Sequence, residues 1–195
     1  FCKQHSIALS IVDAGVNYDF PLTTDLISTK TAKGTQSFVD GPAMSASQLQ
    51  LCFVKGAAIV RTIAKTGSNC IGFGEMGIGN TATAAVLMSV LADFDVQDCV
   101  GRGTGVNAEK LRFKTEILQK AIQNYNGPDA LDSKLAHFGG FEIMQMAGAM
   151  LAAQEEKMII LVDGFICTIA YLVAFMKNPA IRENAIFCHQ SAEQA

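Results

Sequence analysis

Short apolar runs rich in β-branched residues alternate along this chain with longer segments of helical period, and this alternation restricts the fold more than any other feature. Strands are predicted at residues 7–15, 69–74, 158–165 and 185–189. Helices are predicted at residues 45–67, 80–94, 107–125, 131–138, 139–157 and 167–178. Strands that alternate with helices are typical of proteins in which helices cover a parallel sheet. We therefore predict an α/β fold, a parallel sheet with helices on both faces.

Local signals differ in strength along the chain. The helix at 45–67 has clear ends, because Ser45 and Gln48 form the pattern of a capping box and Gly67 supplies a stop. The polar stretch at 17–41 shows no strong period, so no element is predicted there. Residues 98–105 predict a short strand or a turn.

Composition limits the organisation and the partners of the chain. Half of its 195 residues are hydrophobic, which is enough for one domain over residues 1–195 with a core that needs no metal or disulfide. A net charge of −3 without any Lys/Arg block argues against a nucleic-acid or anionic-membrane surface. The long apolar runs are short or are interrupted by Asp163 and Gly164, and no signal peptide opens the sequence. We expect a cytoplasmic protein.

Cysteine and histidine spacing predicts no metal or disulfide framework. The six cysteines are widely spaced and form no C-x-x-C pair, and most lie within apolar patterns, so free thiols are expected. The three histidines are scattered and lack the spacing of metal ligands. We expect neither a metal nor a cofactor.

Three predicted strand ends carry residues suited to ligand binding, because ligands of parallel sheets bind where the strands end. The first is "GFGEMGIGNT", in which glycines admit an anion to backbone N–H groups and Asn80 and Thr81 open a helix. The second is the glycine-rich turn at 100–107, followed by Lys114 in the next helix. The third is Asp163, which ends a buried strand.

Each of these features also has an ordinary structural interpretation. Glycine is common at strand-to-helix turns, Lys114 fits a solvated helix face, and Asp163 fits an N-cap of the helix that follows. Together with the carboxylate of Glu75, they predict a site for a phosphorylated sugar or nucleotide with an acid nearby. The P-loop pattern is absent, and so is the acidic residue that dinucleotide binding requires at a set distance after "GFGEMG".

The motifs resemble those of a known family. "GFGEMGIGNTATAA", "VGRGTG", "GGFEIMQMAGAMLAA", "ILVDGF" and "CHQSAE", in this order, with "DAGV" and "GTQSFVDGPAMS" before them, look like the nicotinate-nucleotide:dimethylbenzimidazole phosphoribosyltransferase (CobT) family. The resemblance implies transfer of phosphoribose from nicotinate mononucleotide to a benzimidazole nitrogen, with inversion at the anomeric carbon, to give α-ribazole 5′-phosphate and nicotinate. It also implies a Rossmann-like domain and a homodimer.

Carried over by motif, the resemblance implies two groups of site residues. The phosphate and ribose would contact Gly77, Gly79, Asn80, Thr81, Gly101, Gly103, Thr104, Gly105 and Lys114. The aromatic base would contact Glu75, and Asp163 would contact the sugar or the nicotinate. Beside Glu75, the apolar side chains of Met76 and Ile78 are expected to offer walls for a flat ring.

The sequence also departs from the family pattern. Family members have helices and an Asp-His-Gly segment before the first matched strand, and a Gly-Glu-Gly-x-Gly-Ala motif after "HQSAE". The glutamate of that motif is the general base of the family, and its expected place lies beyond Ala195. The expectation is therefore a large-domain portion with weak activity of its own, in which Glu75 is a secondary catalytic candidate. Two other possibilities stay open: a catalytically impaired nucleotide-binding module, and a different Rossmann-like nucleotide enzyme.

Overall fold

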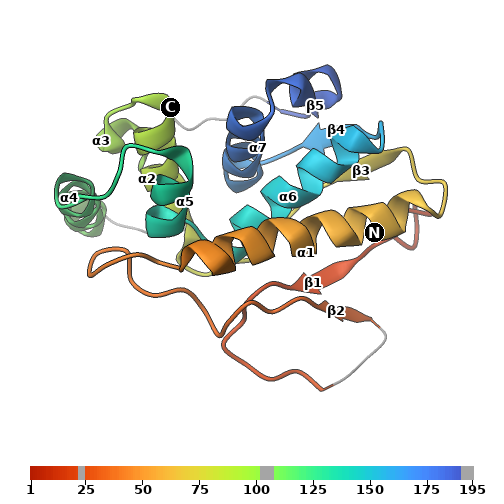
Figure 1. Ribbon diagram of the computed structural model, residues 1–195, viewed down its shortest axis with the longest axis horizontal. Coiled ribbons are helices and arrows are strands. Elements are labelled where there is room, and N and C mark those ends of the chain that lie inside the picture. The colour runs from red at the N-terminus through yellow and green to blue at the C-terminus, as the bar shows by residue number, and fades with distance from the viewer. Residues whose placement is uncertain (22–24, 102–107, 190–195) are drawn as a thin grey trace.

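Parallel strands in two groups form the β-structure of this chain (Figure 1). The computed structural model describes residues 1–21, 25–101 and 108–189. The strands are β1 (Ile11–Asp13), β2 (Leu26–Ser28), β3 (Cys70–Gly72), β4 (Ile159–Val162) and β5 (Ala185–Phe187). β1 pairs with β2, and a second sheet has the order β3-β4-β5, with every pair parallel. The α/β class and the parallel pairing are confirmed, and the strands are divided between two small sheets.

Helices make up most of the rest of the described chain. Their bounds are α1 (Ala46–Ala64), α2 (Asn80–Ala92), α3 (Val96–Cys99), α4 (Ala108–Gln123), α5 (Leu131–Phe138), α6 (Phe141–Glu155), α7 (Phe165–Lys177) and the 3₁₀ helix η1 (Pro179–Glu183). Each predicted helix is present, and α5 has the predicted bounds. None of the described helices is long and apolar enough to cross a membrane.

The start of α1 shows how local sequence sets a helix end. The backbone N–H of Gln48 donates to Ser45 Oγ at 3.2 Å, and the backbone N–H of Ser45 donates to Gln48 Oε1 at 2.9 Å. These two bonds are the predicted capping box, which satisfies N–H groups that have no partner within the helix. Gly67, just beyond the helix, has a φ of +87°, a conformation that glycine adopts without strain.

The core is built around α6, which is buried along nearly its whole length. α1 and α6 run alongside each other, with β1 and β2 below α1 and the β3-β4-β5 sheet beyond α6 (Figure 1). The two helix backbones touch through glycines, since a Cβ on Gly56 would lie 1.9 Å from Gln145 O and a Cβ on Gly148 would lie 2.3 Å from Phe53 O. Only glycine at these positions permits this close packing.

A buried amide attaches α6 to the β1–β2 pair. Gln145 Nε2 donates to Thr29 O at 3.0 Å, and Thr29 Oγ1 donates to Gln145 Oε1 at 2.8 Å. Gln145 is only 4% exposed, so these bonds are shielded from water and satisfy both ends of the amide. They fix the position of α6 relative to the end of β2.

One face of the β3-β4-β5 sheet is covered by helices. α6 and α7 pack against β4, where Ile160 and Val162 are buried. Ile159, on the opposite face, is 45% exposed, and Ile186 on β5 is 52% exposed. In the described residues, therefore, this second face, which was also predicted to carry helices, presents apolar side chains to solvent.

Three local predictions differ from the structure. The strand predicted at 7–15 is limited to the three residues of β1, and β2 lies in the segment predicted to have no element. A strand or turn was predicted at 98–105, but residues 98 and 99 form the end of helix α3. Residues 102–107 lie outside the described ranges. Strands of three residues are too short to show a period of two, which is why β2 was not predicted.

Candidate functional site

A pocket of about 330 Å³ lies at the carboxyl ends of β3 and β4. Its lining residues are Phe73, Gly74, Glu75, Thr81, Asp163, Gly164, Phe165, Ile166 and Cys167. The neighbouring parallel strands end at the same edge, and the helices that follow them, α2 and α7, begin there. The structure thus brings Asp163 to Glu75 and Thr81, which lie some 80 residues earlier in the sequence.

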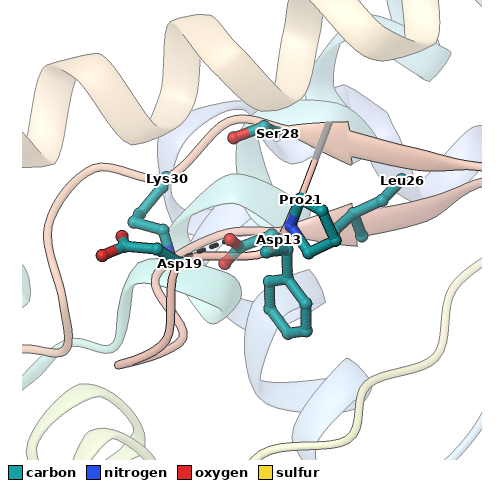
Figure 2. Close-up of a pocket in the computed structure, with 7 residues that line it drawn as sticks. Asp13, Asp19, Pro21, Leu26, Ser28 and Lys30 are labelled. Carbon is teal, nitrogen blue, oxygen red and sulfur yellow. Dashed lines mark ion pairs between the residues drawn. The ribbon is translucent and has the colours of Figure 1, made fainter. Parts of the chain in front are cut away.

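A smaller pocket of about 130 Å³ lies at the ends of β1 and β2 (Figure 2). Figure 2 shows Lys30 reaching Asp13, and their charged atoms are 2.7 Å apart. Asp13 Oδ1 also accepts hydrogen bonds from the N–H groups of Gly15 and Val16, and Lys30 donates to Tyr18 O at 2.9 Å. The charges in this pocket are neutralised within the fold, which indicates a structural role.

Glu75 has one oxygen held by its own loop. Glu75 Oε2 accepts from the N–H of Gly77 at 2.7 Å and from Asn80 Nδ2 at 2.5 Å. Among the described residues, both hydrogen bonds to this carboxylate end on Oε2, and none is made by Oε1. A Cβ on Gly77 would lie 2.1 Å from Asn80 Nδ2, so only glycine leaves room for the amide.

The start of α2, which follows the Glu75 loop, has no side-chain cap. Gly79 is the N-cap with a φ of +86° and no side-chain cap, so N–H groups of the first turn are open to a ligand. Lys114 Nζ donates to Thr81 Oγ1 at 3.1 Å, which places a cation from α4 at this helix end. The predicted contact of Lys114 with the phosphate stays a prediction.

Asp163 is paired with a histidine that sequence reasoning did not select. His189 Nδ1 lies 2.7 Å from Asp163 Oδ1, at the ends of β5 and β4. The N-cap of α7 is Gly164, without a side-chain cap, so the alternative role of Asp163 as an N-cap is not observed. The carboxylate instead lines the pocket. The only available signal for His189 was its place in the "CHQSAE" motif.

Cys167 lines the larger pocket, and its pKa responds to the charges of the carboxylates there. Its thiol donates to Phe73 O at 3.3 Å. Burial raises the pKa of Cys167 to about 11, and the negative charges of Glu75 and Asp163 add to the rise. The thiol is therefore protonated at neutral pH, which argues against a nucleophilic role. All six cysteines lie in the described ranges and are free thiols.

Glu142 is a second carboxylate near Glu75 that sequence reasoning missed. It lies in the first turn of α6, and Asn80 Nδ2 donates to its Oε1 at 3.3 Å. Burial raises the pKa of Glu142, and the charge of Glu75 adds to this effect. In the sequence this residue had the signal of an ordinary helix start, because acidic residues are common there.

Other predicted residues are not brought into the pocket. Met76 and Ile78 are fully exposed, at 103% and 107% of their reference areas. Gly101 is described and half-buried, whereas Gly103, Thr104 and Gly105 lie outside the described residues. No cluster of three or more potential metal ligands was found in the described part of the chain. The roles assigned to these residues stay predictions.

The predicted general base cannot be placed in this pocket. Residues 190–195, up to Ala195, lie outside the described ranges. The glutamate that the family resemblance implies has its expected place beyond Ala195 and is not one of the 195 residues of this sequence. Among the predicted catalytic groups, the structure therefore describes Glu75 alone, and the role of the other glutamate stays a prediction.

Comparison with known proteins gives consistent results. A family model described as "Phosphoribosyltransferase" matches residues 1–195. Curated relatives from Dechloromonas aromatica and Cupriavidus taiwanensis, both named nicotinate-nucleotide–dimethylbenzimidazole phosphoribosyltransferase, are each 46% identical over 99% and 100% of this chain. The crystal structure of CobT from Thermus thermophilus matches with a TM-score of 0.92 and 30% identity over 99% of this chain and 58% of its own.

The chain spans 56% of the length of these two curated relatives. The family match, in contrast, covers every residue of the sequence. The chain therefore belongs to the phosphoribosyltransferase family whose curated members are named nicotinate-nucleotide–dimethylbenzimidazole phosphoribosyltransferase.

Proposed function

We propose that residues 1–195 form the nucleotide-binding domain of a phosphoribosyltransferase that transfers phosphoribose from nicotinate mononucleotide to 5,6-dimethylbenzimidazole. The product would be α-ribazole 5′-phosphate, for the lower ligand of cobalamin. The observation that carries the proposal is the pocket that places Glu75 and Asp163 beside the open start of α2. The names of the relatives supply the substrates.

The phosphate is assigned to the start of α2. Backbone N–H groups from Gly79 to Thr81, the positive end of the helix dipole and the Lys114 ammonium favour an anion at this point. The predicted contacts of Gly77, Gly101, Gly103, Thr104 and Gly105 with the phosphate and ribose form part of the same proposal.

The proposed transfer depends mainly on the orientation of the two substrates and less on a catalytic group that acts on C1′. The acceptor nitrogen attacks C1′ with its lone pair, the bond from C1′ to nicotinate breaks, and that electron pair stays on the pyridine nitrogen. The acceptor ring loses its N–H proton to a base, a contribution typically of about 10²–10⁴ in rate. In this proposal Glu75 accepts a hydrogen bond from that N–H through Oε1 and so orients the ring, which is supported by the loop hydrogen bonds that hold Oε2. Met76, Ile78 and Asp163 complete the proposed base and nicotinate contacts.

Nicotinate release tests the proposal. The Gly-Glu-Gly-x-Gly-Ala motif does not occur among these 195 residues, so we expect this chain alone to bind nicotinate mononucleotide and to release nicotinate at well under about 1 s⁻¹. Calorimetry measures the binding, and chromatography of released nicotinate measures the rate. A fast release would refute the assignment of the base to the motif outside this sequence, and the absence of binding would refute the function.

The phosphate assignment predicts loss of affinity when Gly79 gains a side chain. A Cβ at Gly79 meets no atom within 4 Å, yet it would occupy the space that a phosphate needs to reach the N–H group. Because φ is +86°, valine would be strained there, whereas asparagine tolerates this region. We expect Gly79→Asn to melt like the wild type and to bind nicotinate mononucleotide at least about tenfold more weakly. Unchanged affinity would move the phosphate to the turn after Gly101.

The oligomeric state and the cellular location are also part of the proposal. We propose a homodimer, supported by the apolar side chains that the β3-β4-β5 sheet exposes, since large apolar patches are unusual on monomers. Light scattering at micromolar concentration tests it, and a monomeric mass would contradict it.

A cytoplasmic location without nucleic-acid or membrane partners is proposed from the net charge of −3 and the lack of a basic block. Fractionation of cells expressing the protein tests the location.

A further inference from the structure

We propose that Glu142 is a positioning residue for Glu75 and acts through the side-chain amide of Asn80. The inference rests on the proposed function only for the task given to Glu75, which is to orient the acceptor base. The link between the three side chains is a property of the fold. It joins the start of α2 to the start of α6 across 62 residues of sequence.

One amide nitrogen contacts both carboxylates. Asn80 Nδ2 lies 2.5 Å from Glu75 Oε2 and 3.3 Å from Glu142 Oε1. Asn80 is 7% exposed, so these hydrogen bonds to charged acceptors form away from water, where they are stronger than at the surface.

The other end of the same amide has no partner. Asn80 Oδ1 is buried, and no hydrogen-bond donor meets it among the described residues. Such a group usually costs about 1–3 kcal/mol, so a buried amide would be expected to rotate toward a better arrangement. Rotation here would turn Oδ1 toward the carboxylate of Glu75 and cause repulsion. The two carboxylates therefore determine the orientation of the amide, and its oxygen is left without a donor.

Glu142 is the rigid end of this link. It projects from α6, which is buried along its length and packed against α1, whereas Glu75 lies on a loop between β3 and α2. With Glu142 removed, the amide of Asn80 would keep only the carboxylate of Glu75 as a partner, and that partner lies on the loop instead of on a packed helix. Glu75 and Asn80 could then move together, and Oε1, the oxygen proposed to meet the acceptor base, would lose its fixed direction.

The charges around Glu142 agree with this geometry. Burial raises its pKa, the hydrogen bond from Asn80 opposes the rise, and the charge of Glu75 adds to it. From α1, the buried thiol of Cys52 also faces Glu142, and the Glu142 charge contributes to the raised pKa of Cys52, after the larger effect of burial. Glu75 and Glu142 are thus coupled through one shared donor.

The first test is a titration that needs no substrate. Carbon-13 nuclear magnetic resonance of labelled glutamate carboxyls follows Glu142 in the wild type and in two variants. Glu75→Gln removes a like charge and lowers the pKa of Glu142, whereas Asn80→Ser removes a hydrogen bond to the charged form and raises it. The Asn80→Ser variant is decisive, because the effect of Glu75 could act through space. An unmoved pKa of Glu142 in Asn80→Ser would overturn the proposal, whatever the chain binds.

The second test asks whether the link matters for the acceptor base. We expect Glu142→Leu to weaken binding of 5,6-dimethylbenzimidazole about tenfold and to leave the affinity for nicotinate mononucleotide unchanged. Glu142→Gln keeps an acceptor oxygen and should restore most of the affinity. Glu156→Gln, at an exposed position after the same helix, is the matched control. Equal loss of both ligands, or no rescue by glutamine, would show a merely structural residue. If the wild type binds no base, the proposed function fails while the titration still decides the link.

Discussion

Replacing Gly148 by valine is expected to abolish the folded state of this chain at physiological temperature. A Cβ at this position would lie 2.3 Å from Phe53 O and 2.5 Å from Phe53 Cα, atoms of the α1 backbone that cannot rotate away. Relief requires α1 and α6 to separate along the core. Overpacking of side chains costs about 1–3 kcal/mol, and a collision between two helix backbones should exceed about 4 kcal/mol. Thermal unfolding followed by circular dichroism measures the effect.

A glycine in open space provides the control for this prediction. A Cβ at Gly41 meets no atom within 4 Å, and its backbone lies outside the positive-φ region, so Gly41→Val should melt close to the wild type. A Gly148→Val protein with a native melting curve would show that α1 and α6 do not pack as described. The consequence would extend to the candidate site, because Glu142 is positioned by the first turn of α6.

Lys30→Met is expected to lower the free energy of unfolding by about 3–5 kcal/mol, the usual effect of removing one partner of a buried ion pair. Lys30 lies 2.7 Å from Asp13, and the side chains are 19% and 3% exposed. Methionine fills similar space but leaves the Asp13 carboxylate buried without its counter-charge. Urea unfolding at neutral pH measures the loss, and a change below about 1 kcal/mol would contradict the structural role of the pair.

The control is an exposed ion pair from the same region. Lys33 pairs with Asp19 at 2.5 Å, but the side chains are 51% and 75% exposed, so Lys33→Met should change stability by less than about 1 kcal/mol.

The dependence of stability on pH is a second test of the pair between Lys30 and Asp13. Burial tends to raise the pKa of Asp13, but the hydrogen bond and charge of Lys30 and backbone N–H groups outweigh it and hold the pKa below its usual value. The stabilisation is present above the unfolded pKa of about 3.9 and is lost as pH falls through the lower folded value.

Much of the candidate site could be predicted from the sequence because its main parts are local. The glycine loop, the helix start at Asn80 and Thr81, and the acid at Glu75 lie within one short segment. Asp163 follows a strand whose apolar pattern is visible, and parallel strands end at one edge, so its meeting with Glu75 followed from the fold class. Lys114 was assigned to the phosphate by the family resemblance, and the structure shows its hydrogen bond to Thr81, which the sequence did not predict.

The residues that contact Asp163 and Glu75 from distant segments could not be predicted from the sequence. His189 pairs with Asp163, and Glu142 shares Asn80 with Glu75, through contacts between segments 26 and 62 residues apart. No local pattern distinguishes Glu142 from any acid in a first helical turn. Met76 and Ile78 were assigned to the base contacts on their apolar character, yet their exposure depends on how the loop leaves the sheet.

By itself, the sequence determined the elements of this protein whose hydrogen bonds and periodicity are local. The capping box of Ser45 and Gln48, the bounds of α5 and the α/β class all follow from neighbours within a few residues or from alternation of apolar patterns. Only the tertiary structure decided the division of the strands into two sheets, the glycine contact of α1 with α6, and the Glu75–Asn80–Glu142 link. The reason is physical: these features depend on which distant surfaces pack together, and the energy of that packing is not encoded in any single segment.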